Sequence, residues 1–179
     1  MLEQRIQQQF FESADLQYQS AEHLSRPIAE AAAAVLGAIT GGGKVLAAGS
    51  GAGQALAQHL AQLFITRFER ERPPLAALAL GRQPMAQVLA LGLPGDVLLL
   101  LDDGETDCAA LIRAAQGKDM TLVVLAGQGA AALNEYLAET DVLVALPSER
   151  PARVAELQLL ALHCLCDAVD FQLMGEQEP

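Results

Sequence analysis

Five short apolar runs constrain the fold of this chain more than any other feature of its sequence. The runs cover residues 44–49, 74–80, 96–101, 120–127 and 141–146. The segments between them have helical apolar spacing and cover residues 54–68, 84–92, 106–116 and 130–138. Strands that are apolar throughout are typical of a parallel sheet with helices on both faces. Right-handed crossovers then predict a doubly wound α/β domain of five strands.

Further helices are expected at both ends of this alternating pattern. Residues 2–24 and 26–40 predict two helices, the second rich in alanine and ended by three glycines at 41–43. Residues 152–174 predict a long final helix. A chain of 179 residues, 52% of them hydrophobic, is long enough for one core. We therefore expect a single domain over 1–179, in which a helical segment (1–40) precedes the α/β core (41–179).

Charge and composition exclude several classes of function. The formal net charge is −11, and the only basic cluster, Arg67, Arg70 and Arg72, is interleaved with Glu69 and Glu71. A surface that binds nucleic acid needs clustered cations, so direct nucleic-acid binding is not expected. No apolar run approaches the ~20 residues of a membrane span, and the first ten residues have no signal-peptide core. We expect no membrane association.

The three cysteines, Cys108, Cys164 and Cys166, form neither a disulfide framework nor a CxxC metal motif. An odd number of cysteines fits a reduced compartment, so a cytoplasmic location is expected. Cys108 lies in the first turn of a predicted helix, which lowers a thiol pKa, but the neighbouring acids act in the opposite direction. We expect all three to be small core residues.

Two stretches are predicted to follow strands at the carboxyl edge of the sheet, where doubly wound folds bind ligands. "GSGAG" (49–53) follows the first strand and opens a helix. Glycines there allow backbone N–H groups to approach an anion at the helix terminus. Gln54 stands where the dinucleotide fingerprint requires glycine, which disfavours a nicotinamide site. A tight turn and a phosphate cradle remain as alternatives.

The second stretch, "DDGETD" (102–107), places four acids within six positions after the third strand. The run is too short for a calcium-binding loop. Acids before a helix cap free N–H groups and complement the helix dipole. We interpret the four acids of this run, which begins with Asp102 and Asp103, in this way, and expect their charges to repel a phosphate.

His59 and His163 are each predicted to lie in the middle of a helix. A lone histidine on an apolar helix is usually a core or interface residue. Two histidines could share a metal, but zinc takes three or four protein ligands. Leu60 and Leu63 follow His59 on its helix.

The sequence resembles the sugar isomerase (SIS) domain family over nearly its whole length. The resemblance is carried by "GGGKVLAAGSGAGQALAQHLAQLFITRFERERPPLAALAL", "GLPGDVLLLLD", "MTLVVLAG" and "RPARVAELQLLALHCLCDAVDFQLMG". "RFERERP" and "HCLCDAVD" point to the branch of phosphoheptose isomerases and DnaA initiator-associating proteins. The resemblance implies a flavodoxin-like five-stranded sheet, a leading helix used in assembly, and a homotetramer with sites between subunits.

The resemblance also implies a set of site residues. Isomerases of this family bind zinc and carry out acid–base chemistry through two histidines, a glutamate and a glutamine. His59 and His163 match the histidines, with His163 as the candidate base. Leu63 stands in place of the glutamate and Ala155 in place of the glutamine.

The ligand-binding loops depart from the family as well. The first loop, with a serine-containing Asn-Gly-Gly-Ser motif in the family, reads Ser50, Gly51, Ala52 and Gly53. The third-strand loop, Ser-Thr-Ser-Gly-Asn-Ser in the family, begins here with Asp102 and Asp103 and includes Thr106. The named residues of these two loops are the candidate ligand-binding residues. The segment between 81 and 92 is also shorter than in the family.

From these departures we expect a non-catalytic, oligomeric regulatory scaffold, similar to the DnaA initiator-associating protein. Its partners would be further copies of itself and DnaA, with Leu173 and Met174 near the end of the last helix as a candidate partner surface. Two alternatives are an active phosphoheptose isomerase, acting on sedoheptulose 7-phosphate, and a phosphosugar sensor without turnover. No cofactor is expected, except zinc if the isomerase site persists.

Overall fold

The computed structural model describes residues 1–104 and 107–175. Its helices and strands alternate as the sequence predicts. In chain order they are α1 (Leu2–Thr40), β1 (Val45–Gly49), α2 (Ala52–Ile65), β2 (Ala77–Ala79), α3 (Pro84–Leu91), β3 (Val97–Leu101), α4 (Ala109–Gln116), β4 (Thr121–Ala126), the 3-10 helix η1 (Gln128–Glu135), β5 (Val142–Ala145) and α5 (Pro151–Met174).

The five strands form one parallel sheet in the order β2-β1-β3-β4-β5. The predicted flavodoxin-like order is thus confirmed. Strand order reverses between β1 and β3, whose register pairs Val45 with Val97 and Gly49 with Leu101. The carboxyl ends of β1 and β3 therefore lie side by side, and the two loops that follow them meet at the switch point of the sheet.

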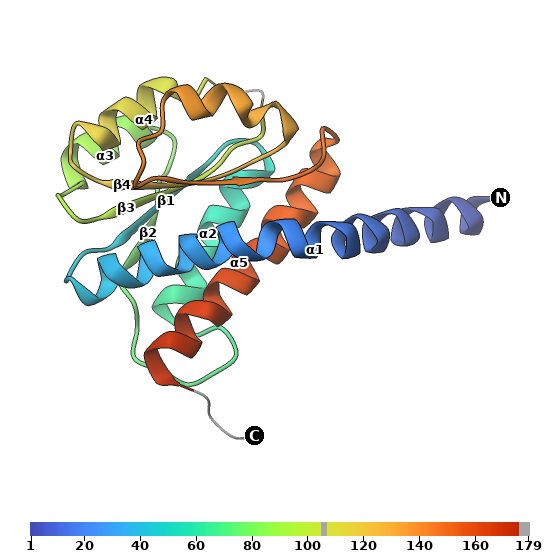
Figure 1. Cartoon of the computed structure of the whole chain (residues 1–179), viewed down its shortest axis with the longest axis horizontal. Coiled ribbons are helices and arrows are strands. Elements are labelled where there is room, and N and C mark those ends of the chain that lie inside the picture. The colour runs from blue at the N-terminus through green and yellow to red at the C-terminus, as the bar shows by residue number, and fades with distance from the viewer. Residues whose placement is uncertain (105–106, 176–179) are drawn as a thin grey trace.

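Helices cover both faces of the sheet. Alternate residues of β3 face opposite sides, so that Leu99 packs with α1, α2 and α5 while Leu98 and Leu100 pack with α3 and α4. Figure 1 shows these two helical layers above and below the strands. Burial on both faces explains why the strands are apolar at every position.

The first forty residues form one helix, not the two predicted helices. Pro27 lies inside α1, where it removes one hydrogen bond and would disrupt an isolated helix by about 3 kcal/mol. The helix continues through Pro27 because residues beyond it are tightly packed: Ala31, Ala32 and Val35 are fully buried in the core. Tertiary packing therefore overrides the local preference for a break.

The amino-terminal part of α1 extends away from the rest of the molecule (Figure 1). Several large apolar side chains on it are exposed, namely Leu2, Ile6, Phe10, Phe11 and Tyr18. None of the helices in the described residues combines the length and apolar character that a membrane crossing requires.

Three elements differ in length or type from the prediction. The edge strand β2 contains only three residues and pairs with β1 alone, after the break at Pro73 and Pro74. The helix expected at 130–138 is the 3-10 helix η1, in a stretch where Gly127 and Gly129 disfavour a regular α-helix. Helix α4 begins at Ala109, three residues later than expected.

Candidate functional site

The β1–α2 loop brings the amino end of α2 against the ends of two strands. A Cβ atom on Gly49 would lie 2.3 Å from the backbone of Gly53, and one on Gly53 would lie 2.7 Å from the carbonyl oxygen of Leu101. Gly51 has φ +50°, in the region that favours glycine. The glycines are therefore required by close packing as well as by the turn, and Ala52 becomes the first residue of α2.

Ser50 directly follows β1 and lines a cavity at the carboxyl edge of the sheet. Its Oγ is buried and has no hydrogen-bond partner within the described part of the chain. Buried hydroxyl groups are almost always paired. The Ser50 hydroxyl is therefore suited to a hydrogen bond with a polar ligand.

The acids after β3 hold the start of α4 in place. The Asp107 carboxylate accepts a hydrogen bond from the Ala109 N–H (2.9 Å), so it caps α4. Asp102 is buried, and its carboxylate accepts a hydrogen bond from the Cys108 thiol (3.4 Å). Asp103 points toward the β1–α2 loop, with Oδ2 3.0 Å from the position that a Gly51 Cβ would occupy. Capping is thus supplied by Asp107, whereas the predicted ligand residue Thr106 lies outside the described residues.

Cys108 is not an activated nucleophile. Burial raises the pKa of its thiol to about 12, and the carboxylate of Asp102 adds to the shift. The thiolate, which is the reactive form, is therefore negligible near neutral pH.

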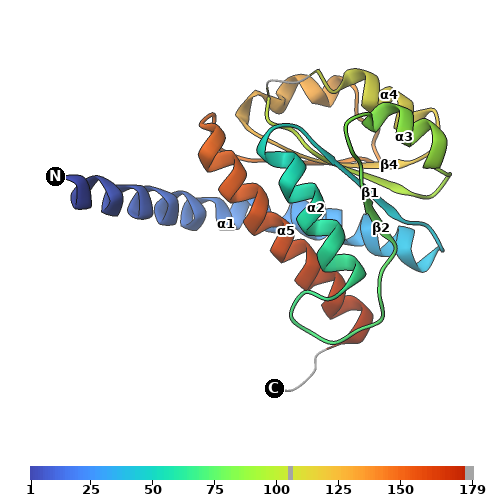
Figure 2. The ribbon, with the colours of Figure 1, turned by 180° about the vertical axis from the view of Figure 1, so that it is seen from behind.

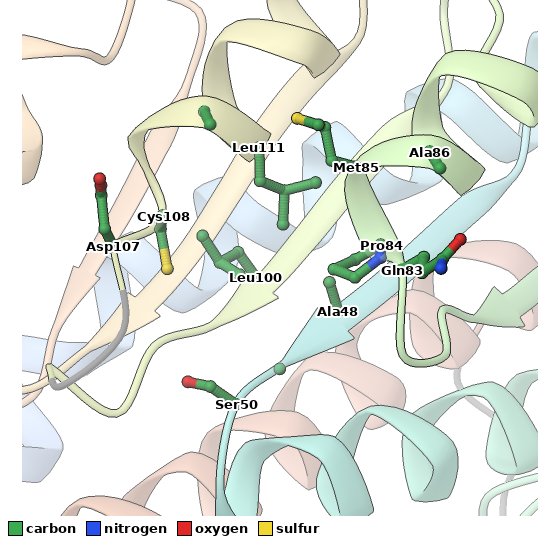
Figure 3. Close-up of a pocket in the computed structure, with 12 residues that line it drawn as sticks. Ala48, Ser50, Gln83, Pro84, Met85, Ala86, Leu100, Asp107, Cys108 and Leu111 are labelled. Carbon is green, nitrogen blue, oxygen red and sulfur yellow. The ribbon is translucent and has the colours of Figure 1, made fainter.

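A cavity of about 380 Å³ opens between the ends of β1 and β3 and the first turns of α3 and α4. Its walls are mainly apolar, and Figure 3 shows Leu100, Leu111 and Met85 converging on it, with Ser50 and Cys108 at one side. Among the residues that the structure describes, no lysine or arginine lines it.

A smaller hollow of about 150 Å³ lies between the β1–α2 loop and the start of α5. Gly51, Gly53 and Asp103 line one side of it, and Ala155 and Gln158 line the other. The hollow therefore lies at the amino end of α2, where the helix dipole favours an anion.

The two predicted histidines meet between α2 and α5, helices that lie side by side in Figure 2. His59 Nε2 lies 3.1 Å from His163 Nε2, and both side chains are partly buried. A neutral imidazole carries one N–H, so a hydrogen bond between two Nε2 atoms requires that one is protonated and the other is not. The pair therefore offers a proton donor and a proton acceptor at adjacent positions.

The surroundings of His163 keep it neutral. Burial lowers its pKa, the neighbouring His59 lowers it further, and the carboxylate of Glu69 acts in the opposite direction. The ring of Phe68 packs against the imidazole, with 5.3 Å between ring centroids. A neutral histidine is the form required of a general base.

Zinc does not fit the donors that this chain brings together. Among the described residues, no three His, Cys, Asp or Glu side chains cluster closely enough to hold a metal ion. One turn after His59 on α2 stands Leu63, which packs against the core, and Ala155 lines the hollow on α5. Two imidazoles leave zinc short of the three or four protein ligands it takes, and no step below is routed through a metal.

The two residues of the candidate partner surface at the end of α5, Leu173 and Met174, lie in different surroundings. Leu173 packs against the core, whereas Met174 is 38% exposed. The two residues therefore do not form a joint exposed apolar surface, because successive residues of a helix point in different directions.

Sequence reasoning missed four residues that organise the site. Gln158 is buried and donates to the carbonyl oxygens of Asp102 (2.9 Å) and Leu125 (3.0 Å), which ties α5 to the ends of β3 and β4. Phe68 contacts His163, and Arg72 is buried with Asp170. Arg72 and Asp170 belong to the motifs "RFERERP" and "HCLCDAVD", but their pairing across 98 residues left no local signal.

Comparison with known proteins agrees with this fold. The model of the SIS domain family matches residues 9–127, so the chain is an SIS-domain protein. It is 52% identical to a phosphoheptose isomerase of Methylibium petroleiphilum, over 99% of this chain and 98% of that protein. It is 39% identical to a phosphoheptose isomerase of an Azoarcus species, over 97% of this chain and 98% of that protein. The solved phosphoheptose isomerase of Francisella tularensis superimposes with a TM-score of 0.88 at 30% identity, covering 95% of this chain and 98% of that one. The chain belongs to the phosphoheptose isomerase family.

These relatives show that the expected non-catalytic, DnaA-associated scaffold is wrong. Full-length relatives at 52% and 39% identity are phosphoheptose isomerases, which are enzymes. The expectation gave too much weight to the changed loop residues. It rested on substituted positions such as Leu63 and did not include the 3.1 Å contact between His59 and His163.

Proposed function

We propose that this protein is a phosphoheptose isomerase, which interconverts sedoheptulose 7-phosphate and the corresponding aldose. The observation that carries the proposal is the contact between His59 and His163. These are the two histidine positions to which the family resemblance assigns acid–base chemistry. The full-length relatives at 52% and 39% identity support the same reaction.

The histidine pair can supply both proton transfers of an aldose–ketose isomerisation. A base removes a proton from the hydroxymethyl carbon next to the ketone, while the ketone oxygen takes up a proton, and an enediol forms. The enediol then loses the proton of its other hydroxyl group and regains one at the former ketone carbon, which gives the aldose. The unprotonated Nε2 is the base and the protonated Nε2 the acid, and the 3.1 Å hydrogen bond between them must open so that both atoms can face the substrate.

The phosphate is best accommodated at the amino end of α2. The hollow there is lined by Gly51, Ala52 and Gly53, whose backbone approaches a ligand closely, and also by the Asp103 carboxylate, whose charge opposes a phosphate. At α4 the Ala109 N–H is already bonded to Asp107, and a phosphate would meet that carboxylate. The Ser50 hydroxyl, which is buried and unpaired within the described residues, can hydrogen-bond a sugar hydroxyl.

The proposal is tested by the turnover of sedoheptulose 7-phosphate by the purified protein. Loss of a positioned general base costs about 10²–10⁴-fold in rate, so His163→Ala and His59→Ala should each lower kcat by that factor. His23→Ala is the matched control, because His23 is exposed on α1, and it should leave kcat unchanged. Absence of turnover by the wild-type protein, or equal loss in the control, would overturn the proposal.

We also propose that the protein associates with further copies of itself through α1. The exposed side chains of Leu2, Ile6 and Phe10 repeat every four residues along the projecting part of α1. A groove of about 320 Å³ between α1 and α5, lined mainly by apolar side chains, offers a surface for such a helix. Replacing these three residues with glutamate should convert an oligomer into a monomer in light scattering. A wild-type monomer would contradict the proposal.

A further inference from the structure

Arg72 is a charged side chain in the interior, 1% exposed, and its guanidinium connects two helices. Its Nε donates to Asp170 of α5, which is 2% exposed. Its Nη1 donates to the carbonyl oxygen of Phe64 (2.9 Å) and its Nη2 to that of Leu63 (3.0 Å). Carbonyl groups in the last turn of a helix lack partners within the helix. Arg72 therefore fixes the end of α2 to α5.

This connection lies on the faces of α2 and α5 that carry the histidines. Asp170 follows His163 by seven residues, two turns along α5, and Leu63 follows His59 by four residues, one turn along α2. The separation of the two helices at Arg72 therefore limits how far the two imidazoles can move apart.

The chain between α2 and Arg72 also contacts the site. Arg72 donates to the carbonyl oxygen of Pro73 (3.2 Å), which holds the end of the connecting segment. Within that segment the Phe68 ring packs against His163 at 5.3 Å. His163 thus contacts both His59, which lies on α2, and Phe68, which lies on the connecting segment.

We propose that Arg72 and Asp170 are positioning residues for the reaction, which hold the His59–His163 pair and Phe68 in their working geometry. The proposal rests on the isomerase function proposed above. Neither residue touches the imidazoles; they act through the spacing of α2 and α5.

The hydrogen bonding of the ion pair supports a role in positioning more than in stability. Asp170 Oδ2 is buried without a partner among the described residues, so the carboxylate is bound through one oxygen only. Buried ion pairs with unsatisfied atoms contribute little net stability compared with apolar residues of similar size. The fork of the guanidinium, by contrast, sets the direction of each hydrogen bond.

The test compares two sets of variants of the full chain. Asp170→Asn removes the charge and keeps the shape, and Asp96→Asn is its control, because Asp96 is a buried partner of Lys44 elsewhere in the fold (2.5 Å). The double variant Arg72→Met, Asp170→Leu replaces the pair with apolar side chains, so it retains a stable core while losing the directed hydrogen bonds.

Two readouts separate positioning from stability. The first is the proton NMR shift of the His163 ring, which the adjacent Phe68 ring displaces. The second is the steady-state turnover of sedoheptulose 7-phosphate. Misplacement of catalytic groups by about 1 Å costs about 10²-fold in rate, so Asp170→Asn and the double variant should lose the ring-current shift and about 100-fold in kcat, with KM unchanged.

Each outcome has a defined meaning. Asp96→Asn should lower the melting temperature while leaving the His163 ring shift and kcat unchanged. If Asp170→Asn and the double variant retain the wild-type ring shift, or if Asp96→Asn changes it equally, the positioning role is overturned. If the wild-type protein shows no turnover, the isomerase proposal fails, and the NMR comparison still decides whether Arg72 and Asp170 hold the histidine pair.

Discussion

Substitution of Gly49 by alanine tests whether close packing at the end of β1 places α2 and its histidine. The new methyl group would lie 2.3 Å from the carbonyl carbon and oxygen of Gly53, where ordinary contacts begin near 3.4 Å, so the start of α2 must retreat by about 1 Å. Both obstacles are backbone atoms and cannot rotate away. Overpacking of this kind costs about 1–3 kcal/mol, or about 2–12 °C in melting temperature for a chain of this length.

The same displacement should reach the site, because His59 lies on α2. A shift of about 1 Å in a catalytic group costs about 10²-fold in rate, so Gly49→Ala should lower kcat for sedoheptulose 7-phosphate by about that factor. Gly37→Ala in α1 is the control, since a methyl group there meets nothing within 4 Å. It should raise stability by about 0.5–1 kcal/mol and leave kcat unchanged. A Gly49→Ala protein with wild-type melting temperature and wild-type kcat would refute this reasoning.

Three further predictions concern charge and ionisation. Asp103→Asn removes a negative charge beside the hollow at the amino end of α2. The substrate phosphate should then bind more favourably by on the order of 1 kcal/mol, which steady-state assays should show as a lower KM with kcat unchanged. In a thiol titration of the native protein, Cys108 and Cys166, which are buried and have pKa values raised to about 12 by burial, should react only after denaturation. Cys164 is exposed in the single chain and lines the α1–α5 groove, so it should react in a monomer and be protected where a second copy covers that groove. Burial lowers the pKa of His163 below its value in the unfolded chain, so the unfolded state binds more protons. The free energy of unfolding, measured in urea, should therefore decrease as pH falls below about 6.5. His163→Gln should weaken this pH dependence.

The elements of the fold were largely predictable because each has a local signal. Runs such as 97–101 are apolar at every position, which only a strand buried on both faces requires. Pro27 was misleading because its local cost is outweighed by burial of Ala31, Ala32 and Val35, which no local pattern reveals. The short β2 reflects its place at the edge of the sheet, where a single neighbour supplies hydrogen bonds.

The site was predictable in its location but not in its contacts. The glycines of 49–53 and the acids of 102–107 follow strands, so the carboxyl edge of the sheet was expected. That Asp107 caps α4 while Asp102 accepts the Cys108 thiol depends on where α4 begins. The expected non-catalytic role was based on substituted positions alone, and the full-length phosphoheptose isomerase relatives show that it was wrong.

The sequence by itself determined the doubly wound sheet and the edge at which the glycine-rich and acidic loops lie, because hydrophobic period and glycine placement act over a few neighbouring residues. Only the tertiary structure decided that His59 and His163, 104 positions apart, share a 3.1 Å contact. It also decided that Arg72 and Asp170 form a buried pair beside them. Such contacts depend on the spacing of α2 and α5, which is set by the packing of both helices on the sheet.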